Sequence, residues 1–281
     1  MIRQPNPPRN LIRLNKFLAR HGLCSRRQAD EWILAGRVSV DGLIQREMGV
    51  QVDPARQTIA VDGRPLLQAP PPLYIAMHKP AGVVTTLQDP QGRKTVRDLL
   101  PESWQGQGVF PVGRLDYDSS GLLLLTNDGD WGQILLHPRH QVWKEYRVTT
   151  DQVLTPDQRQ WLEQGVVLDH RRTAPARVTV GNTGEGEPRR FQIAIREGRN
   201  RQIRRMCEAI GHPIIGDPKY GREDHRRRDA MHVMPEALER KLHLLARRLV
   251  LPHPAGGVID VTAPLPEHMQ KTWDMFGFDA K

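Results

Sequence analysis

The chain has 281 residues, with 41 Lys and Arg against 32 Asp and Glu, so its formal charge is +9 and its pI is about 10.0. This length allows one large domain or a main domain with a smaller attachment, and the positive charge favours nucleic acid as a partner. Two cysteines are too few for a disulfide framework, and the sequence lacks a membrane-spanning apolar run, a Walker loop, a dinucleotide-binding glycine motif and a His-Glu-x-x-His metal motif.

The sequence begins with a predicted flexible leader, residues 1–11, which is rich in proline, poor in apolar residues and without a stretch of signal-peptide type. Leu14, Phe17 and Leu18 then recur at helical spacing, and Gly22 is placed to end that helix. A folded unit is therefore expected directly after the leader.

Ser25 and Gln28 have the spacing of a capping box, which predicts a second short helix that ends before Gly36. Residues 37–42 alternate as a strand does and finish in an Asp-Gly turn.

Basic side chains that can neutralise phosphates gather around the two helices: Lys16, Arg20, Arg26, Arg27 and Arg37. The segment LNKFLARHGLCSRRQADEWILAGRVSVDG resembles the S-four (alpha-L) RNA-binding domain of a ribosomal small-subunit protein. We interpret residues 12–65 as such a small α/β domain, with an ordinary basic helical pair as the alternative.

Residues 66–73 contain three consecutive prolines and predict an extended linker. Beyond it, short β-rich segments alternate with helical ones, which predicts a mixed α+β domain over residues 74–281, with a mainly antiparallel sheet and flanking helices. Four of its predicted strands lie at 74–77, 121–126, 145–148 and 190–195.

A polar loop bounded by glycines, residues 113–121, leads into an apolar run that predicts a buried strand. A loop anchored in this way can hold a carboxylate in near-attack geometry and leave it open to substrate. Asp116, Asp118 and Asp128 are the candidates. Asp128 also suits a turn and Asp118 can satisfy loop backbone groups, so spacing alone does not select among the three.

The segment GRLDYDSSGLLLLTNDG, residues 113–129, resembles the signature of the bacterial ribosomal-RNA pseudouridine synthases that carry an N-terminal S-four-type domain. HKPAGVVTT (78–86), KEYRV (144–148) and EGRNRQIRRM (197–206) fit the same family. The resemblance implies isomerisation of a specific uridine to pseudouridine in ribosomal RNA, after the nucleotide is flipped into a pocket.

The resemblance also implies that Asp116 is the nucleophile, that Tyr146 contacts the target base and that Arg204 pairs with the aspartate. A guanidinium near Asp116 would help to keep it ionised where burial raises its pKa. The alternatives are that Tyr146 is an ordinary core residue and that Arg204 lies on a solvated basic face. Arg204 is expected in a helix with arginines along its margin. The apolar stripe of this helix consists of Ile203, Met206, Cys207 and Ile210. Further arginines are expected to bind phosphate: Arg114, Arg199, Arg201 and Arg205.

The C-terminal part is less typical of that family, because residues 211–221, 243–249 and 263–266 look more like the sister group that acts on ribosomal and transfer RNA. Transfer RNA as the substrate, a non-catalytic RNA-binding or ribosome-assembly factor, and a metal-dependent nuclease therefore remain as alternatives. A basic segment, residues 225–228, faces either substrate or solvent.

We expect a cytoplasmic monomer that acts on structured RNA, ribosomal RNA above all, without a cofactor, a metal or a membrane.

Overall fold

The computed structural model describes residues 11–67, 69–137, 142–150, 153–180, 190–220, 241–254 and 256–275. Residues 1–10 of the predicted leader and the basic segment 225–228 lie outside this part of the chain. Two compact units are present: one contains Met1–Ile75, Leu99–Phe110 and Leu125–Gly132, and the other contains the remaining segments. In the described part, no helix is long and apolar enough to cross a membrane.

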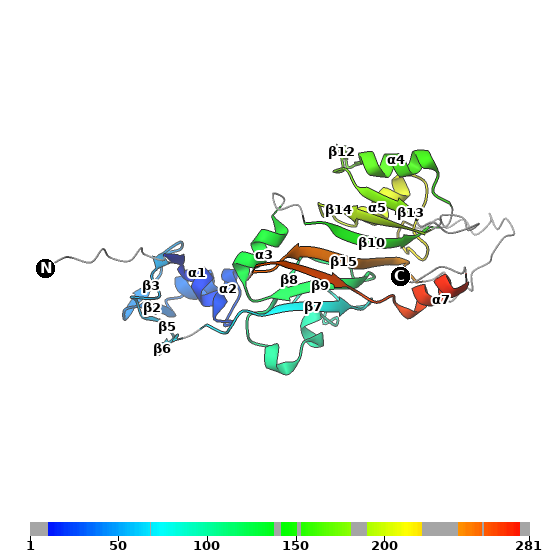
Figure 1. Cartoon of the computed structure of the whole chain (residues 1–281). Coiled ribbons are helices and arrows are strands. Elements are labelled where there is room, and N and C mark those ends of the chain that lie inside the picture. Colours follow the sequence, from blue (N-terminus) through cyan, green and yellow to red (C-terminus); the bar gives the residue numbers. More distant parts are fainter. Residues whose placement is uncertain are drawn as a thin grey trace. The chain divides into compact units, whose positions relative to one another are not determined.

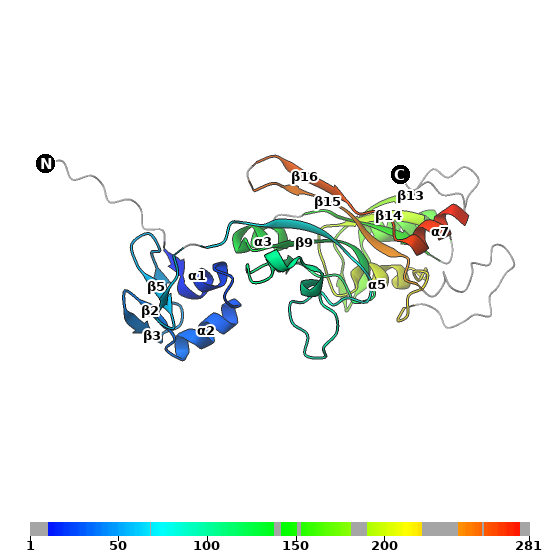
Figure 2. The ribbon, with the colours of Figure 1, turned by 90° about the horizontal axis from the view of Figure 1, so that it is seen from below.

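The first unit packs two helices against short strands (Figure 2). Strands β3, β2, β5 and β6 form an antiparallel sheet in that order, and β1 pairs with β4. Its elements are β1 (Ile12–Arg13), α1 (Leu14–Arg20), α2 (Arg26–Leu34), β2 (Val38–Val40), β3 (Leu43–Gln45), β4 (Gln51–Val52), β5 (Ile59–Val61) and β6 (Arg64–Pro65).

Local signals in the sequence account for both helices. Leu14, Phe17 and Leu18 are buried in the core of the first unit, as their helical spacing predicts. Helix α2 begins with a complete capping box, in which the Ser25 hydroxyl accepts from the Gln28 backbone N–H and the Gln28 side chain accepts from the Ser25 N–H. Both predicted helices are therefore confirmed.

The second unit is built on a larger sheet, whose strand order is β13-β14-β10-β15-β9-β7, with β16 on β15 and β8 on β9 (Figure 1). The β13–β14, β14–β10, β10–β15 and β15–β16 pairs are antiparallel, and β15–β9 is parallel. All four predicted strands occur, so the mixed α+β class with a mainly antiparallel sheet is confirmed. The strands are β7 (Tyr74–Lys79), β8 (Phe110–Val112), β9 (Ser120–Thr126), β10 (Lys144–Thr149), β13 (Arg177–Val180), β14 (Arg190–Ile195), β15 (Leu244–Pro252) and β16 (Val258–Thr262).

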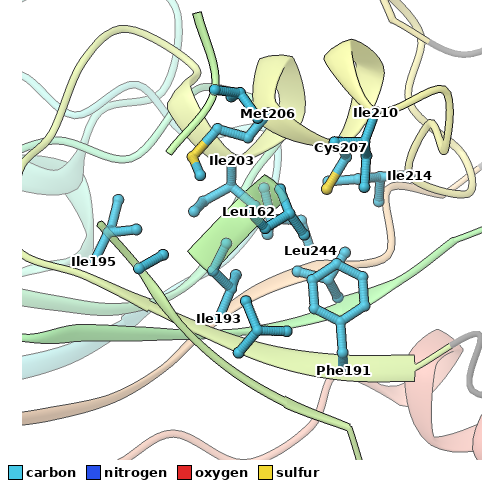
Figure 3. Packing of buried hydrophobic residues seen from close by; sticks show 14 of the residues in the cluster. Leu162, Phe191, Ile193, Ile195, Ile203, Met206, Cys207, Ile210, Ile214 and Leu244 are labelled. Atoms are coloured by element: carbon cyan, nitrogen blue, oxygen red, sulfur yellow. The ribbon is translucent and has the colours of Figure 1, made fainter. Parts of the chain in front are cut away.

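The helices α4 (Pro156–Gln164) and α5 (Gln202–Ala209) cover one face of this sheet. Figure 3 shows Ile203, Met206 and Cys207 of α5 directed towards Ile193 and Phe191 of β14. Helix α7 (Glu267–Met275) packs on the opposite face through a small cluster of Leu245, Met269 and Trp273. The remaining elements are η1 (Val96–Leu99), η2 (Glu102–Trp104), α3 (Gly129–Leu136), β11 (Val167–Leu168) and β12 (Arg171–Arg172).

Gly121 fixes the approach of β9 to β15. Gly121 pairs with Ala246 in the parallel ladder, has a φ of +123°, and a Cβ there would lie 2.4 Å from the Ala246 carbonyl oxygen. Both strands carry site residues, so neither can shift without moving the site. Only glycine fits this backbone conformation and this spacing.

We therefore expect Gly121→Ala to lower the free energy of unfolding by on the order of 3 kcal/mol, because the new methyl group overlaps backbone atoms. Urea denaturation of the full chain measures this loss. Gly42→Ala provides the control: Gly42 also has a positive φ, but no atom lies within 4 Å of the position of its Cβ. An equal loss in both variants would show that φ alone, and not the contact with β15, sets the cost.

Candidate active site

The candidate site is built around the loop 113–119, which joins β8 to β9. Thr85 anchors this loop: its hydroxyl donates to the Leu115 carbonyl oxygen at 2.7 Å and accepts from the Leu115 N–H at 3.2 Å. Within the loop, the Ser119 N–H donates to the Asp116 carbonyl oxygen at 3.1 Å. Asp116 thus has a fixed backbone while 26% of its side chain stays exposed.

Arg204, in α5, is fully buried, since its side chain is 0% exposed. Its Nε and Nη2 donate to the two carboxylate oxygens of Asp217 at 2.7 and 2.6 Å. Its Nη1 donates to both oxygens of Asp118 at 2.9 Å and lies 3.8 Å from Oδ2 of Asp116. Three carboxylates surround Arg204, so the alternative in which it is a solvated residue is wrong.

Asp217 holds Arg204 in place. Its side chain is fully buried, and its Oδ1 also accepts the backbone N–H groups of Lys219 and Tyr220 at 2.9 and 3.0 Å. Burial opposes the ionisation of Asp217, but the hydrogen bonds from Arg204 and from these N–H groups keep its pKa below the usual value. The ion pair therefore stays charged and its geometry is fixed at neutral pH.

Burial dominates the electrostatics of Asp116 and raises its pKa above the usual value. Arg201, whose Nε lies 3.8 Å from Asp116 Oδ2, and Arg204 both oppose this rise, and the charge of Asp118 adds to it. The arginines limit the rise in pKa and do not reverse it. A raised pKa makes the Asp116 carboxylate a stronger base than an ordinary aspartate.

Tyr146 lies in β10 at a β-bulge, where the register with β15 shifts between Glu145 and Tyr146. A bulge re-aims the side chains beside it. Tyr146 packs against the main core cluster and also lines the cleft that contains Asp116. Burial, together with the charge of Asp116, raises its pKa to about 12, so its hydroxyl keeps its proton at neutral pH.

Lys79, at the end of β7, is fully buried beneath the Asp116 loop. Its Nζ donates to the carbonyl oxygens of Pro80 and Ser119 at 2.8 and 2.7 Å. Burial lowers its pKa to about 8, although the charges of Asp118 and Asp116 favour the protonated form. The ammonium group therefore ties the start of β9 to the end of β7.

A cleft of about 540 Å³ opens over these groups. The loop 113–117, Lys144 and Tyr146 of β10, and the segment 198–204 all line it. This volume accommodates a nucleotide-sized group. The structure thus brings Asp116, Tyr146 and Arg204 to one cleft, as the sequence predicts.

The two competing aspartates have other partners. Asp118 is bound by Arg204, and Asp128 accepts the backbone N–H groups of Asp130 and Trp131 at the start of α3. Asp128 therefore has the turn role that its sequence context suggests, whereas Asp118 binds a side chain and not the backbone groups considered for it. Asp116 is the aspartate of the three that lines the cleft.

Most of the basic residues expected to bind phosphate already have a partner. Lys16 and Arg20 share Asp130, Arg37 pairs with Asp62, and Arg205 pairs with Asp169. Arg199 donates to the carbonyl oxygens of Arg171 and Arg172, and Arg201 lies beside Asp116. Arg26, Arg27 and Arg114 are exposed and have no carboxylate partner among the described residues.

Three residues of the site are absent from the sequence-based set of site residues: Lys79, Thr85 and Asp217. Lys79 and Thr85 lie in the HKPAGVVTT segment, so the motif marks their position although not their contacts. Asp217 lies 13 residues beyond Arg204 in a turn, and nothing in that spacing indicates an ion pair.

Comparisons with known proteins identify the family of the chain. The family described as RNA pseudouridylate synthase matches residues 73–209, and the S4 domain matches residues 12–56. The chain is 41% identical to ribosomal large subunit pseudouridine synthase B of Bacillus subtilis over 214 residues, which cover 76% of this chain and 85% of the relative. It is 36% identical over 209 residues to the dual-specificity RNA pseudouridine synthase RluF of Escherichia coli, covering 74% and 68% of the two chains.

A crystal structure of a pseudouridylate synthase superposes with a TM-score of 0.50 at 28% identity, over 72% of this chain and 85% of the other. Human RNA pseudouridylate synthase domain containing 4 shares the fold, with a TM-score of 0.53 at 20% identity over 73% and 90% of the two chains. The Asp116 cleft, the two matched domains and these relatives agree, and the chain belongs to the RNA pseudouridylate synthase family.

Proposed function

We propose that this enzyme isomerises a specific uridine of ribosomal RNA, with Asp116 as the nucleophile. One observation carries the proposal: a single cleft presents the partly exposed Asp116 beside Tyr146, Arg201 and Arg204. Ribosomal RNA is preferred because the relative from Bacillus subtilis is named for the ribosomal large subunit. Transfer RNA is the alternative substrate.

Pseudouridine formation breaks the bond between N1 of uracil and C1′ of the ribose, and joins C1′ to C5 after the base rotates. The C5 proton is lost to solvent, and no electrons are exchanged with a cofactor. Asp116 acts at the ribose, by attack on C1′ or by removal of a proton from the neighbouring carbon, or it attacks the uracil base. Tyr146 contacts the flipped base and, with its pKa near 12, offers a protonated hydroxyl.

The proposed role of Arg204 is to position and stabilise the Asp116 carboxylate through its 3.8 Å approach, while its hydrogen bonds with Asp118 and Asp217 hold it rigid. Arg201 approaches Asp116 from the N-terminal end of the same helix. Together they counteract the burial that would otherwise favour protonation of Asp116.

The test of this function is release of tritium from unmodified ribosomal RNA transcripts that contain uridine labelled at C5, followed by mapping of pseudouridine. We expect stoichiometric release from one site of large-subunit RNA in the presence of a metal chelator. Tritium release from transfer RNA alone would show that transfer RNA, and not ribosomal RNA, is the substrate. RNA binding without tritium release would support the non-catalytic alternative. RNA cleavage that the chelator stops would support a nuclease.

The pH dependence of kcat/KM is expected to report on the Asp116 carboxylate. Because the pKa of Asp116 is raised, activity should fall on the acid side at a higher pH than an ordinary aspartate would cause. Arg201→Asn should move this fall to still higher pH, because Arg201 is the strongest of the charges that lower this pKa. Asn is a suitable replacement because Arg201 has a φ of +51°, which Asn tolerates.

Arg114→Asn is the graded control for this profile, because Arg114 acts on Asp116 in the same direction but more weakly. The acid-side fall in kcat/KM should move to higher pH by less in Arg114→Asn than in Arg201→Asn. Identical profiles for the wild type and Arg201→Asn would show that another group controls the acid side.

We further propose that residues 12–65 form an RNA-binding domain, that 66–73 are a linker and that 74–281 form the catalytic domain. The match of residues 12–56 to an RNA-binding module supports the first of these. A monomer in the cytoplasm is also proposed, and the free thiols of Cys24 and Cys207 agree with a reducing compartment.

Arg26 and Arg27 provide a direct test of the RNA-binding domain. Both are exposed at the start of α2, so Arg26→Gln combined with Arg27→Gln should weaken RNA binding and make its dependence on salt less steep. Each lost phosphate contact lowers the slope of log K against log salt by about 0.7–0.9. Filter binding at several salt concentrations measures it, and an unchanged slope would contradict the proposed contact.

A further inference from the structure

A basic cluster on the second unit lies outside the site described above. Trp143 directly precedes β10, and the guanidinium groups of Arg177 and Arg196 lie 4.1 and 4.7 Å from the centroid of its ring. Arg177 begins β13 and Arg196 follows β14, so three neighbouring strands bring these side chains together (Figure 1). They are called the Trp143 cluster below.

The cluster lies on the face of the sheet that is turned away from α4 and α5. On β14, Ile193 and Ile195 are buried in the core, and Ala194 and Arg196 alternate with them. Arg177 pairs with Ala194 across β13 and β14, which places it on the same face as Arg196. The side chain of Arg177 is exposed, and those of Trp143 and Arg196 are partly exposed.

Helix α7 covers the other end of this face. There Arg190, at the start of β14, lies over the ring of Trp273 with its guanidinium 4.4 Å from the centroid. Trp273 itself is fully buried in contact with Leu245 and Met269. The two arginine–tryptophan contacts thus occur at opposite ends of β14: one beneath a helix, and the other where the side chains reach solvent.

The solvent-facing end borders the cleft. Lys144 and Ile195, the residues next to Trp143 and Arg196 in the chain, both line the cleft. Glu145 and its cross-strand partner Arg248 line it as well. Glu145 lies two residues from Trp143 and so on the same face of the sheet, which brings the edge of the cleft at Glu145 and Arg248 to the side that carries the Trp143 cluster.

We propose that the Trp143 cluster binds the phosphate backbone of the RNA that flanks the target uridine. Arg177 supplies the main contact, because it is exposed and has no carboxylate partner within the described residues. Trp143 is a positioning residue: stacking on its indole ring restricts two long side chains before RNA arrives, so less conformational entropy is lost on binding. The proposal rests on the proposed function, in which RNA is the substrate. It adds a contact to the phosphate backbone that does not depend on the base sequence.

The experiment measures binding of the full-length protein to unmodified large-subunit ribosomal RNA transcript and to polyuridylate over a range of salt concentrations. Arg177→Gln should weaken binding to both RNAs and lower the salt slope by about 0.7–0.9, as expected for one phosphate contact, and the addition of Arg196→Gln should lower the slope further. Trp143→Ala should lower the slope although it removes no charge, and Trp143→Phe should retain most of it.

Arg159→Gln is the matched control, because Arg159 is an exposed arginine on α4 that pairs with Glu163 and lies away from this face. It changes the net charge of the protein by the same amount as Arg177→Gln. Equal effects of Arg159→Gln and Arg177→Gln on the slope would overturn the proposal, because the net charge would then suffice to explain both.

A purely structural role for the cluster gives a different result. In that case Trp143→Ala would lower the thermal midpoint of unfolding and leave the salt slope of RNA binding unchanged, which also overturns the proposal.

Tritium release by the wild type on the same transcript separates a failure of the cluster proposal from a failure of the proposed function. A wild type that releases no tritium contradicts the function, whereas an active wild type with unaffected Arg177 and Trp143 variants contradicts only the cluster.

Discussion

Asp116→Asn is expected to abolish pseudouridine formation, with a fall in single-turnover rate of roughly 10⁴-fold or more, because an amide cannot act as the nucleophile. RNA affinity should stay near that of the wild type, since the substitution removes a negative charge and no phosphate contact. The measurement is tritium release with enzyme in excess over RNA, together with filter binding on the same preparation.

The stability of this variant is informative as well. Burial raises the pKa of Asp116, so its ionised form opposes folding at neutral pH, and a neutral side chain removes that cost. We therefore expect Asp116→Asn to be at least as stable as the wild type. Asp157→Asn, at an exposed position in the first turn of α4, is the control that should keep full activity. Turnover by Asp116→Asn at the wild-type rate would refute the assignment.

Arg204→Leu is expected to cause the largest loss of stability, about 3–5 kcal/mol, because it leaves the fully buried Asp217 carboxylate without its cation. Urea denaturation at neutral pH measures this loss. Arg205→Leu is a suitable control, because the neighbouring Arg205 pairs with Asp169, whose side chain is 76% exposed. Its stability should remain near that of the wild type.

The pH dependence checks the cause of the loss. The folded-state pKa of Asp217 is lowered, so its ion pair contributes stability above the usual aspartate pKa of about 4 and loses it as the pH falls through the lowered value. The difference between wild type and Arg204→Leu should therefore be largest at neutral pH and shrink in acid. A difference that stays constant with pH would indicate lost packing and not an unpaired carboxylate.

The elements that could be predicted from the sequence are those set by neighbours in the chain. The capping box of Ser25 and Gln28 depends on residues three apart, and the buried stripe of α5 depends on residues three and four apart. The strands β9 and β14 follow from local apolar content and alternation. In each case the interaction that decides the structure lies within one turn or one strand.

The site required information that spacing does not carry. Arg204 meets Asp118 across 86 residues and Asp217 across 13, and its burial depends on both contacts. A sequence pattern treats Arg204 and Arg205 alike, although one is enclosed by carboxylates and the other pairs with an exposed aspartate. The family resemblance supplied Asp116, Tyr146 and Arg204, and the fold supplied the groups that hold them.

The charges around Asp116 have a consequence for how RNA enters the cleft. Three carboxylates, Asp116, Asp118 and Asp217, interact with three cations, Lys79, Arg201 and Arg204, so the formal charges of these six groups sum to zero. The uncharged uracil ring therefore enters beside charges that balance one another, whereas the lining of the cleft further out also carries Arg114, Lys144 and Arg199. The phosphates, by contrast, are drawn to cations at the edge, such as the exposed Arg114. This separation of charge favours one orientation of the nucleotide, with its base inward and its backbone held at the rim.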